Sequence, residues 1–255
     1  MTDKKFLDAV NHVFKTVLGY GKEQAVEIAK AILDHYQVGI DDTSYVDEML
    51  EIALTFDKHG DLDEALKVYT WAEKRALAIG DKIGLRTVYS NIGTVYNNTK
   101  YYNKALEYYE KSLELTPKDD YQEIGILYNN IGFVYKSVLD YEKSVEFYVK
   151  SLNFLRQADD KFSMTASYFN LAEVFAKVEG FDKAIEYMDK CIEIDKELNL
   201  QSLKSDMKYR ESLKSKLEKT QTPTTSQTQK VIVNKAPEKI EKKDKKENKK
   251  GWFGI

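Results

Sequence analysis

Small residues return at a nearly constant interval along this chain, each at the same place in a pattern of apolar and polar positions. The intervals are 40, 40, 39 and 40 residues, and they separate Ala25, Ala65, Ala105, Ser144 and Ala184. A second small residue lies twelve positions before four of these, at Ala53, Gly93, Gly132 and Ala172. A large side chain follows the earlier small residue of each unit by three positions and the later one by four, and these spacings place the residues on one helix face. The pattern therefore predicts a helical hairpin that repeats about every 40 residues.

The small residues have a physical role in such hairpins. They leave room where two antiparallel helices cross, and the large side chains then fill the volume between neighbouring hairpins. Other residues mark the helix ends. We expect Asp61 and Asp140 to cap second helices, and Gly60 and Gly180 to lie in the turns within hairpins.

One unit shows the whole pattern. Residues 86–117 contain Tyr89, Ile92, Gly93, Tyr96, Ala105, Tyr109, Ser112 and Pro117. This series resembles the tetratricopeptide repeat (TPR) family, whose usual unit has about 34 residues. The present chain is similar to TPR proteins with units of about 40 residues. The resemblance implies an all-α, right-handed superhelical solenoid of antiparallel helix hairpins.

The resemblance also divides the chain. It is strong over residues 45–200 and weak over 1–40, where we expect either a degenerate TPR hairpin or an unrelated helical N-cap. Four repeats are predicted within 41–200, at about 45–81, 83–119, 121–160 and 161–200. A capping helix is expected at 201–219, followed at 220–255 by a disordered, Lys-rich tail that ends in an aromatic motif.

Composition agrees with long, exposed helices. Apolar residues make up 42% of the chain and charged residues 32%, with only three prolines. The net charge of −3 hides an asymmetry, because residues 220–255 hold nine lysines against four acids and the rest of the chain carries −8. An acidic body argues against nucleic-acid binding.

No constellation of residues in the sequence points to catalysis or to a cofactor. The three histidines, His12, His35 and His59, are not at metal-ligand spacing, and one cysteine cannot complete a zinc site. That cysteine, Cys191, holds the small-residue position of its repeat, where packing explains it. We therefore predict a protein that is not an enzyme, with no catalytic residue, no metal and no cofactor.

A row of asparagines is the main functional signal. Asn91, Asn130 and Asn170 each lie two residues before the small residue of a first helix, and Asn97 and Asn129 lie nearby. The resemblance places first helices on a concave groove, where amides can hold the main chain of a peptide, as in TPR proteins of the kinesin light chain type. The alternative is that these asparagines only bond between hairpins. Further groove candidates, for mixed apolar and polar contacts, are Phe133, Lys136 and Phe169.

Trp252 and Phe253 lie near the end of the tail, beyond a run of lysines. These rings could dock into a partner, touch a membrane surface weakly, or fold back into the chain's own groove; a merely solubilising tail is the fourth possibility. The sequence shows neither a secretory signal nor an apolar run of spanning length. With a single cysteine, it predicts a cytoplasmic location.

Together these features predict a non-catalytic adaptor. It would bind a peptide or helix of a partner protein in the groove and use the tail as a second contact. Two alternatives stay open: a peptide-responsive TPR regulator and a self-assembling TPR scaffold. The oligomeric state stays open as well.

Overall fold

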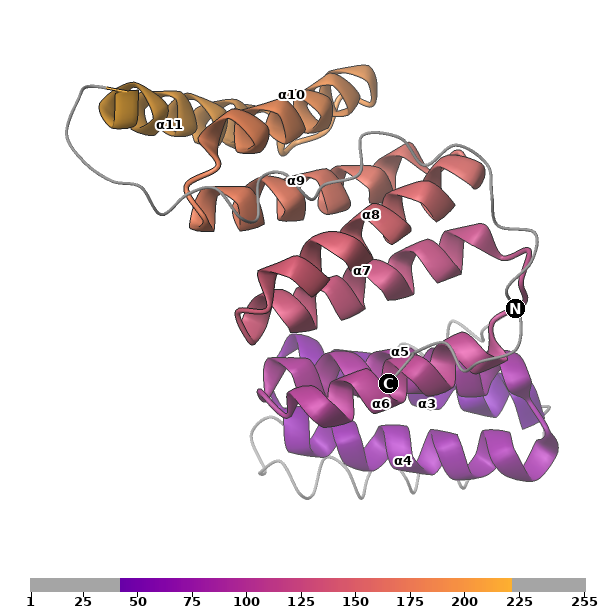
Figure 1. Ribbon diagram of the computed structural model, residues 1–255. Helices are drawn as coiled ribbons and strands as arrows, with labels where there is room; N and C mark the ends of the chain where they lie inside the picture. The colour runs from indigo at the N-terminus through magenta and orange to yellow at the C-terminus, as the bar shows by residue number, and fades with distance from the viewer. Residues whose placement is uncertain (1–41, 222–255) are drawn as a thin grey trace, which may run out of the picture.

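The structure is a computed structural model that describes residues 42–221, and within that range every regular element is an α-helix. The helices form antiparallel pairs stacked one on another (Figure 1). The pairs are α3 (Asp42–Lys58) with α4 (Leu62–Ile79), α5 (Lys82–Asn98) with α6 (Tyr102–Leu115), α7 (Tyr121–Ser137) with α8 (Tyr141–Gln157), and α9 (Lys161–Lys177) with α10 (Phe181–Glu197); α11 (Leu203–Gln221) follows. The predicted all-α array of hairpins is confirmed. The predicted N-terminal hairpin or cap at 1–40 and the tail lie outside the described residues.

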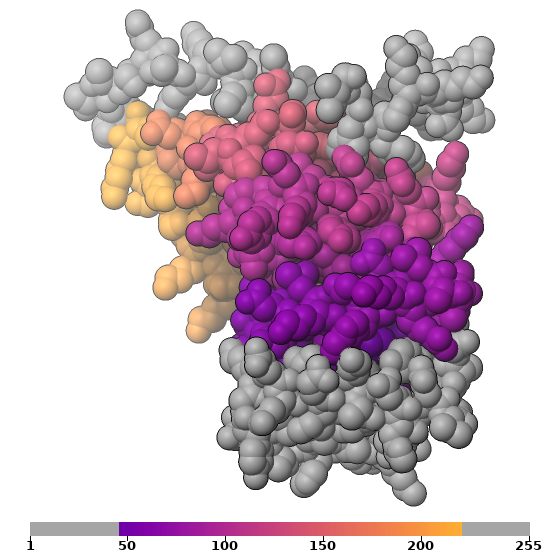
Figure 2. Space-filling model, turned by 90° about the horizontal axis from the view of Figure 1, so that it is seen from below, coloured from indigo at the N-terminus to yellow at the C-terminus, as the bar shows by residue number. Residues whose placement is uncertain are grey.

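The hairpins follow one another in chain order, as the successive colour bands of Figure 2 show. Helix α5 contacts α3, α7 contacts α5, and α9 contacts α7. These are the first helices of their hairpins. Within residues 42–221, no second helix contacts the second helix of the next hairpin to the same extent. Because a curved stack is most closely packed on its inner side, the first helices line the inner face of the solenoid.

Close crossing of the two helices in a hairpin depends on glycine at two positions. A Cβ atom at Gly93 would lie 2.8 Å from the ring of Tyr109, and one at Gly132 would lie 2.8 Å from the ring of Tyr148. Both tyrosines are almost completely buried. The expectation that small residues leave room for the crossing helix is confirmed at these two hairpins.

Aspartates cap several of the helices. The carboxylate of Asp140 accepts a hydrogen bond from the backbone N–H of Lys143, and that of Asp160 accepts one from Ser163. Asp61 is also the residue before its helix, but its side chain makes no cap hydrogen bond, so the predicted cap is wrong there. Its φ of −86° and ψ of 63° are close to those of Asp140, so the difference lies in the orientation of the side chain.

The turns within hairpins contain one left-handed residue each. At Gly60 the φ angle is 80°, as a glycine there allows. Gly180 also lies in its turn, as expected, but its φ is −78° and the left-handed residue is the preceding Glu179, with φ 59°. Lys100 and Leu139 hold the same position in the second and third hairpins, with φ of 65° and 64°. The turn therefore imposes this backbone conformation even on residues with a Cβ atom.

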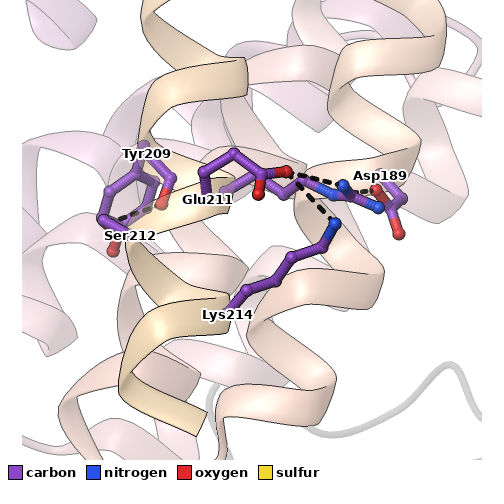
Figure 3. Close-up of polar contacts among 6 residues, drawn as sticks. Asp189, Tyr209, Glu211, Ser212 and Lys214 are labelled. Carbon is purple, nitrogen blue, oxygen red and sulfur yellow. Dashed lines mark hydrogen bonds and ion pairs between the residues drawn. The ribbon is translucent and has the colours of Figure 1, made fainter. Parts of the chain in front are cut away.

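Helix α11 closes the described part of the array by packing on α10. Leu213 is fully buried between them. On the exposed side, the guanidinium of Arg210 donates to Asp189 Oδ1 at 2.6 Å and to Glu211 Oε1 at 2.9 Å (Figure 3). None of the described helices combines the length and the hydropathy that crossing a bilayer requires.

Candidate peptide-binding face

The candidate site lies on the first helices α5, α7 and α9. Asn91, Asn130 and Asn170 are 39 and 40 residues apart and hold the same place in their respective helices. The Asn170 side chain hydrogen-bonds to Asn129 of α7. Asn170 therefore lies on the side of α9 that faces the neighbouring first helix. By register, Asn91 and Asn130 hold the equivalent place on α5 and α7. We call this row, with the residues around it, the inner face.

One group of asparagines is bonded between hairpins. The Asn129 Oδ1 atom on α7 accepts hydrogen bonds from Asn170 Nδ2 and from Ser167 Oγ on α9, each at 3.2 Å. The Lys136 ammonium donates to Asn170 Oδ1 at 2.9 Å and forms an ion pair with Glu173 at 2.8 Å. For Asn129 and Asn170, the structure therefore supports the inter-hairpin role that the sequence left open.

Asn91 and Asn130 differ from that pair. Both side chains are half-buried, and neither makes a side-chain hydrogen bond to another of the described residues. An amide can donate two hydrogen bonds and accept two more. These two side chains are therefore the inner-face asparagines whose polar groups are available to a ligand.

An apolar group and a charged pair lie beside them on α7 and α9. Phe133 is 39% exposed, a large value for an aromatic side chain, and the Lys136 ammonium lies 4.4 Å from the centre of its ring. Lys136 itself is mostly covered, while the Glu173 carboxylate that pairs with it is 38% exposed. The inner face therefore presents an apolar ring, amides and a carboxylate close together.

The remaining candidates are partly covered, buried or outside the described residues. The ring of Phe169 packs against Tyr209 of α11, with ring centres 5.6 Å apart, so α11 covers part of it. Asn97 is buried near the end of α5, and its Oδ1 atom has no hydrogen-bond partner among the described residues. Trp252 and Phe253 lie outside the described residues.

Two residues of this region were not anticipated from the sequence. Glu173 is one turn beyond Asn170 and fixes Lys136. Tyr209 is 40 residues after Phe169, so extending the repeat register into α11 would have found it. Burial, and then the negative charge of Glu173, raises the pKa of Tyr209.

Comparison with known proteins identifies the repeats. A model described as tetratricopeptide repeat matches residues 84–157 and 123–197. No curated protein sequence matches this chain. Repeats of this family support a protein-interaction role in general and are generally not catalytic.

Solved structures agree on the fold. The crystal structure of BtubC (BKLC) from P. vanneervenii is 16% identical, with a TM-score of 0.59 over 92% of this chain and 100% of that one. The STAND protein with a tetratricopeptide repeat sensor from Pyrococcus horikoshii is 18% identical, with a TM-score of 0.63 over 82% of this chain and 34% of that one. Apo RapI is 15% identical, with a TM-score of 0.61 over 68% and 64% of the two chains. The 40-residue pattern, the stacked hairpins and the family match together show that residues 84–197 are built of tetratricopeptide repeats.

Proposed function

We propose that this protein is a non-catalytic adaptor whose inner face binds an extended peptide segment of a partner protein. The observation that carries the proposal is the pair Asn91 and Asn130, which hold equivalent positions on neighbouring first helices and have no side-chain hydrogen bond among the described residues. Polar groups that are half-buried and unpaired are costly unless a ligand or water satisfies them.

The chemistry favours main-chain recognition. An amide side chain matches the alternating donors and acceptors of an extended backbone, whatever side chains that backbone carries. Next to the asparagines, Phe133 offers an apolar contact and Glu173 a negative charge. We therefore expect a ligand with an apolar residue and a basic residue near each other.

The tail is the second contact of the proposed adaptor. Trp252 and Phe253 end a chain segment that is rich in lysine. Two linked contacts would strengthen binding through effective concentration, without any new interaction at either site.

The test is a selection of displayed random peptides on the full-length chain, followed by titration of a selected peptide. Each neutral hydrogen bond contributes about 0.5–1.5 kcal/mol. The double substitution Asn91→Ala and Asn130→Ala should therefore weaken binding by roughly five- to 150-fold, if about one hydrogen bond per amide is lost. The control is Asn103→Ala, since Asn103 is exposed on a second helix.

Two results would contradict the proposal. One is a selected peptide that binds the double variant as tightly as the original protein, with circular dichroism showing both to be folded. The other is a selection that yields no binding peptide at all. A truncated variant that ends at Lys219 tests the contribution of the tail separately from that of the inner face. It should keep its affinity for the selected peptide but bind a full-length partner more weakly.

A further inference from the structure

Three acidic or thiol side chains meet in the buried interface between α10 and α11. They are Cys191 and Asp195, one turn apart on α10, and Asp206 in the first turn of α11. The exposed fraction is 1% for Cys191, 0% for Asp195 and 7% for Asp206. One candidate ligand atom from each lies within 4.8 Å of those of the other two.

The preceding repeat shows how unusual these residues are. Cys191 and Asp195 are 40 residues beyond Ser151 and Leu155, and Ser151 lies beside Ser167 of α9. In that repeat the two serine hydroxyls bond to each other at 2.9 Å, and the leucine is fully buried.

In the last unit the same two core positions of the second helix hold a thiol and a carboxyl group, and a second carboxyl group, from α11, lies beside them. Burial of charged groups in a core is unfavourable unless they are paired or bind a cation. A local departure of this kind from the repeat pattern is typical of a functional site.

An unsatisfied atom points to a ligand. The Asp195 Oδ2 atom accepts a hydrogen bond from Ser202 Oγ at 3.0 Å. Its other oxygen, Oδ1, is buried and has no hydrogen-bond partner among the described residues. In many metal sites one oxygen of the carboxylate binds the metal and the other accepts a supporting hydrogen bond. Here Oδ2 has such a hydrogen bond, and Oδ1 is the oxygen without a partner.

Geometry and ligand type select the class of cation. The Cys191 thiol is in hydrogen-bond contact as a donor with Asp206 Oδ2 at 3.6 Å and with the Thr165 carbonyl at 3.5 Å. A tetrahedral zinc ion with ordinary Zn–S and Zn–O bonds separates its sulfur and oxygen ligands by about 3.5 Å. Mg²⁺ and Ca²⁺ prefer oxygen ligands alone, whereas zinc accepts thiolate and carboxylate together.

We infer that Cys191, Asp195 and Asp206 form a binding site for a zinc-class divalent cation, which joins α11 to α10. Three protein ligands leave a fourth position for water. The cation would add a buried link to the exposed one that Arg210 makes with Asp189 (Figure 3). It would therefore hold in place the helix whose Tyr209 covers Phe169 at the end of the inner face.

A proton shared between the carboxyl groups is the competing explanation. Burial, and then the adjacent carboxyl group of Asp195, raises the pKa of Asp206 to about 6. Burial, followed by the two aspartates, also raises the pKa of the Cys191 thiol. Because a metal must displace these protons, its affinity should increase with pH.

The test titrates metal-free full-length protein with Zn²⁺ and, separately, with Co²⁺ as a spectroscopic probe. We expect one equivalent to bind, the melting temperature to rise with Zn²⁺, and Co²⁺ to give the near-ultraviolet charge-transfer band of a cobalt–sulfur bond. Cys191→Ser should abolish the band, while Asp195→Asn and Asp206→Asn should each weaken binding about tenfold or more. The control Glu193→Gln changes an exposed acid on the same helix and should bind like the original protein.

A further variant protects the test against misfolding. Cys191→Ser and Asp195→Leu copy the residues of the preceding repeat, and Asp206→Ser supplies a second hydroxyl like that of the Ser151–Ser167 pair. This triple variant should therefore fold yet fail to respond to Zn²⁺. The inference is overturned if the folded protein shows no cobalt–sulfur band. It is also overturned if the melting temperature depends on pH but not on Zn²⁺, which would leave only a shared proton, or if the triple variant binds Zn²⁺ equally well.

Discussion

Gly132 of α7 faces the ring of Tyr148 of α8 so closely that a Cβ atom on the glycine would lie 2.8 Å from the ring. The tyrosine is fully buried and lies in the core, so it has little room to move. This contact sets how closely the two helices of the third hairpin can cross.

We expect Gly132→Ala to destabilise the protein. Overpacking of a core costs about 1–3 kcal/mol, of which the better helix propensity of alanine offsets up to about 1 kcal/mol. The free energy of unfolding in urea measures the net loss. In a Tyr148→Leu background the same substitution should cost much less, since the obstructing ring is gone. An equal cost in both backgrounds would contradict the steric explanation.

Replacing Leu139 by glycine should stabilise the protein. Leu139 has a φ of 64° and is 69% exposed, so it carries the cost of a left-handed backbone and contributes little packing. Left-handed conformation costs a non-glycine residue about 1–2 kcal/mol, so Leu139→Gly should raise the free energy of unfolding by about 1 kcal/mol. The neighbouring Val138, with φ −91°, provides the control, because Val138→Gly should be destabilising. If both substitutions destabilise alike, the turn stores no strain at Leu139.

Asp160 should contribute stability at neutral pH that is lost in acid. Burial by itself would raise the pKa of Asp160, but hydrogen bonds from Ser163 and Gln122 outweigh it and hold the pKa below its ordinary value. A carboxyl group whose pKa is lowered by folding stabilises the folded protein fully at pH values above its pKa in the unfolded chain, 3.8. This contribution is lost as the pH falls through the lower pKa that the group has in the folded protein.

The corresponding variant is Asp160→Ala. Loss of an N-cap costs about 1 kcal/mol, and the difference from the original protein should shrink as pH is lowered from 7 toward 3. Thermal unfolding across this range measures it. Asp119→Ala, one residue before the cap of α7, should show no comparable pH dependence. A difference that stays constant with pH would mean that the carboxylate charge plays no part in the cap.

The sequence by itself determined the helical hairpins and their order. Helix periodicity and the 40-residue interval are local properties, so residue type and spacing alone identify Gly93 and Gly132 as crossing points and Asp140 as a cap. The repeat match and the fold agree with that prediction. The cap expected of Asp61 failed, because side-chain orientation at a helix end is not determined by residue type.

Only the tertiary structure decided which polar groups are satisfied. The sequence made Asn130 and Asn170 equivalent, yet Asn170 is bonded to Asn129 and Lys136 whereas Asn130 has no such bond among the described residues, since hydrogen bonds between hairpins depend on how successive first helices stack. In the same way, Asp206 is fifteen residues from Cys191 along the chain and 3.6 Å from it in space. Local spacing predicts the face of a helix, but the packing of one helix on the next determines which chemical groups meet there.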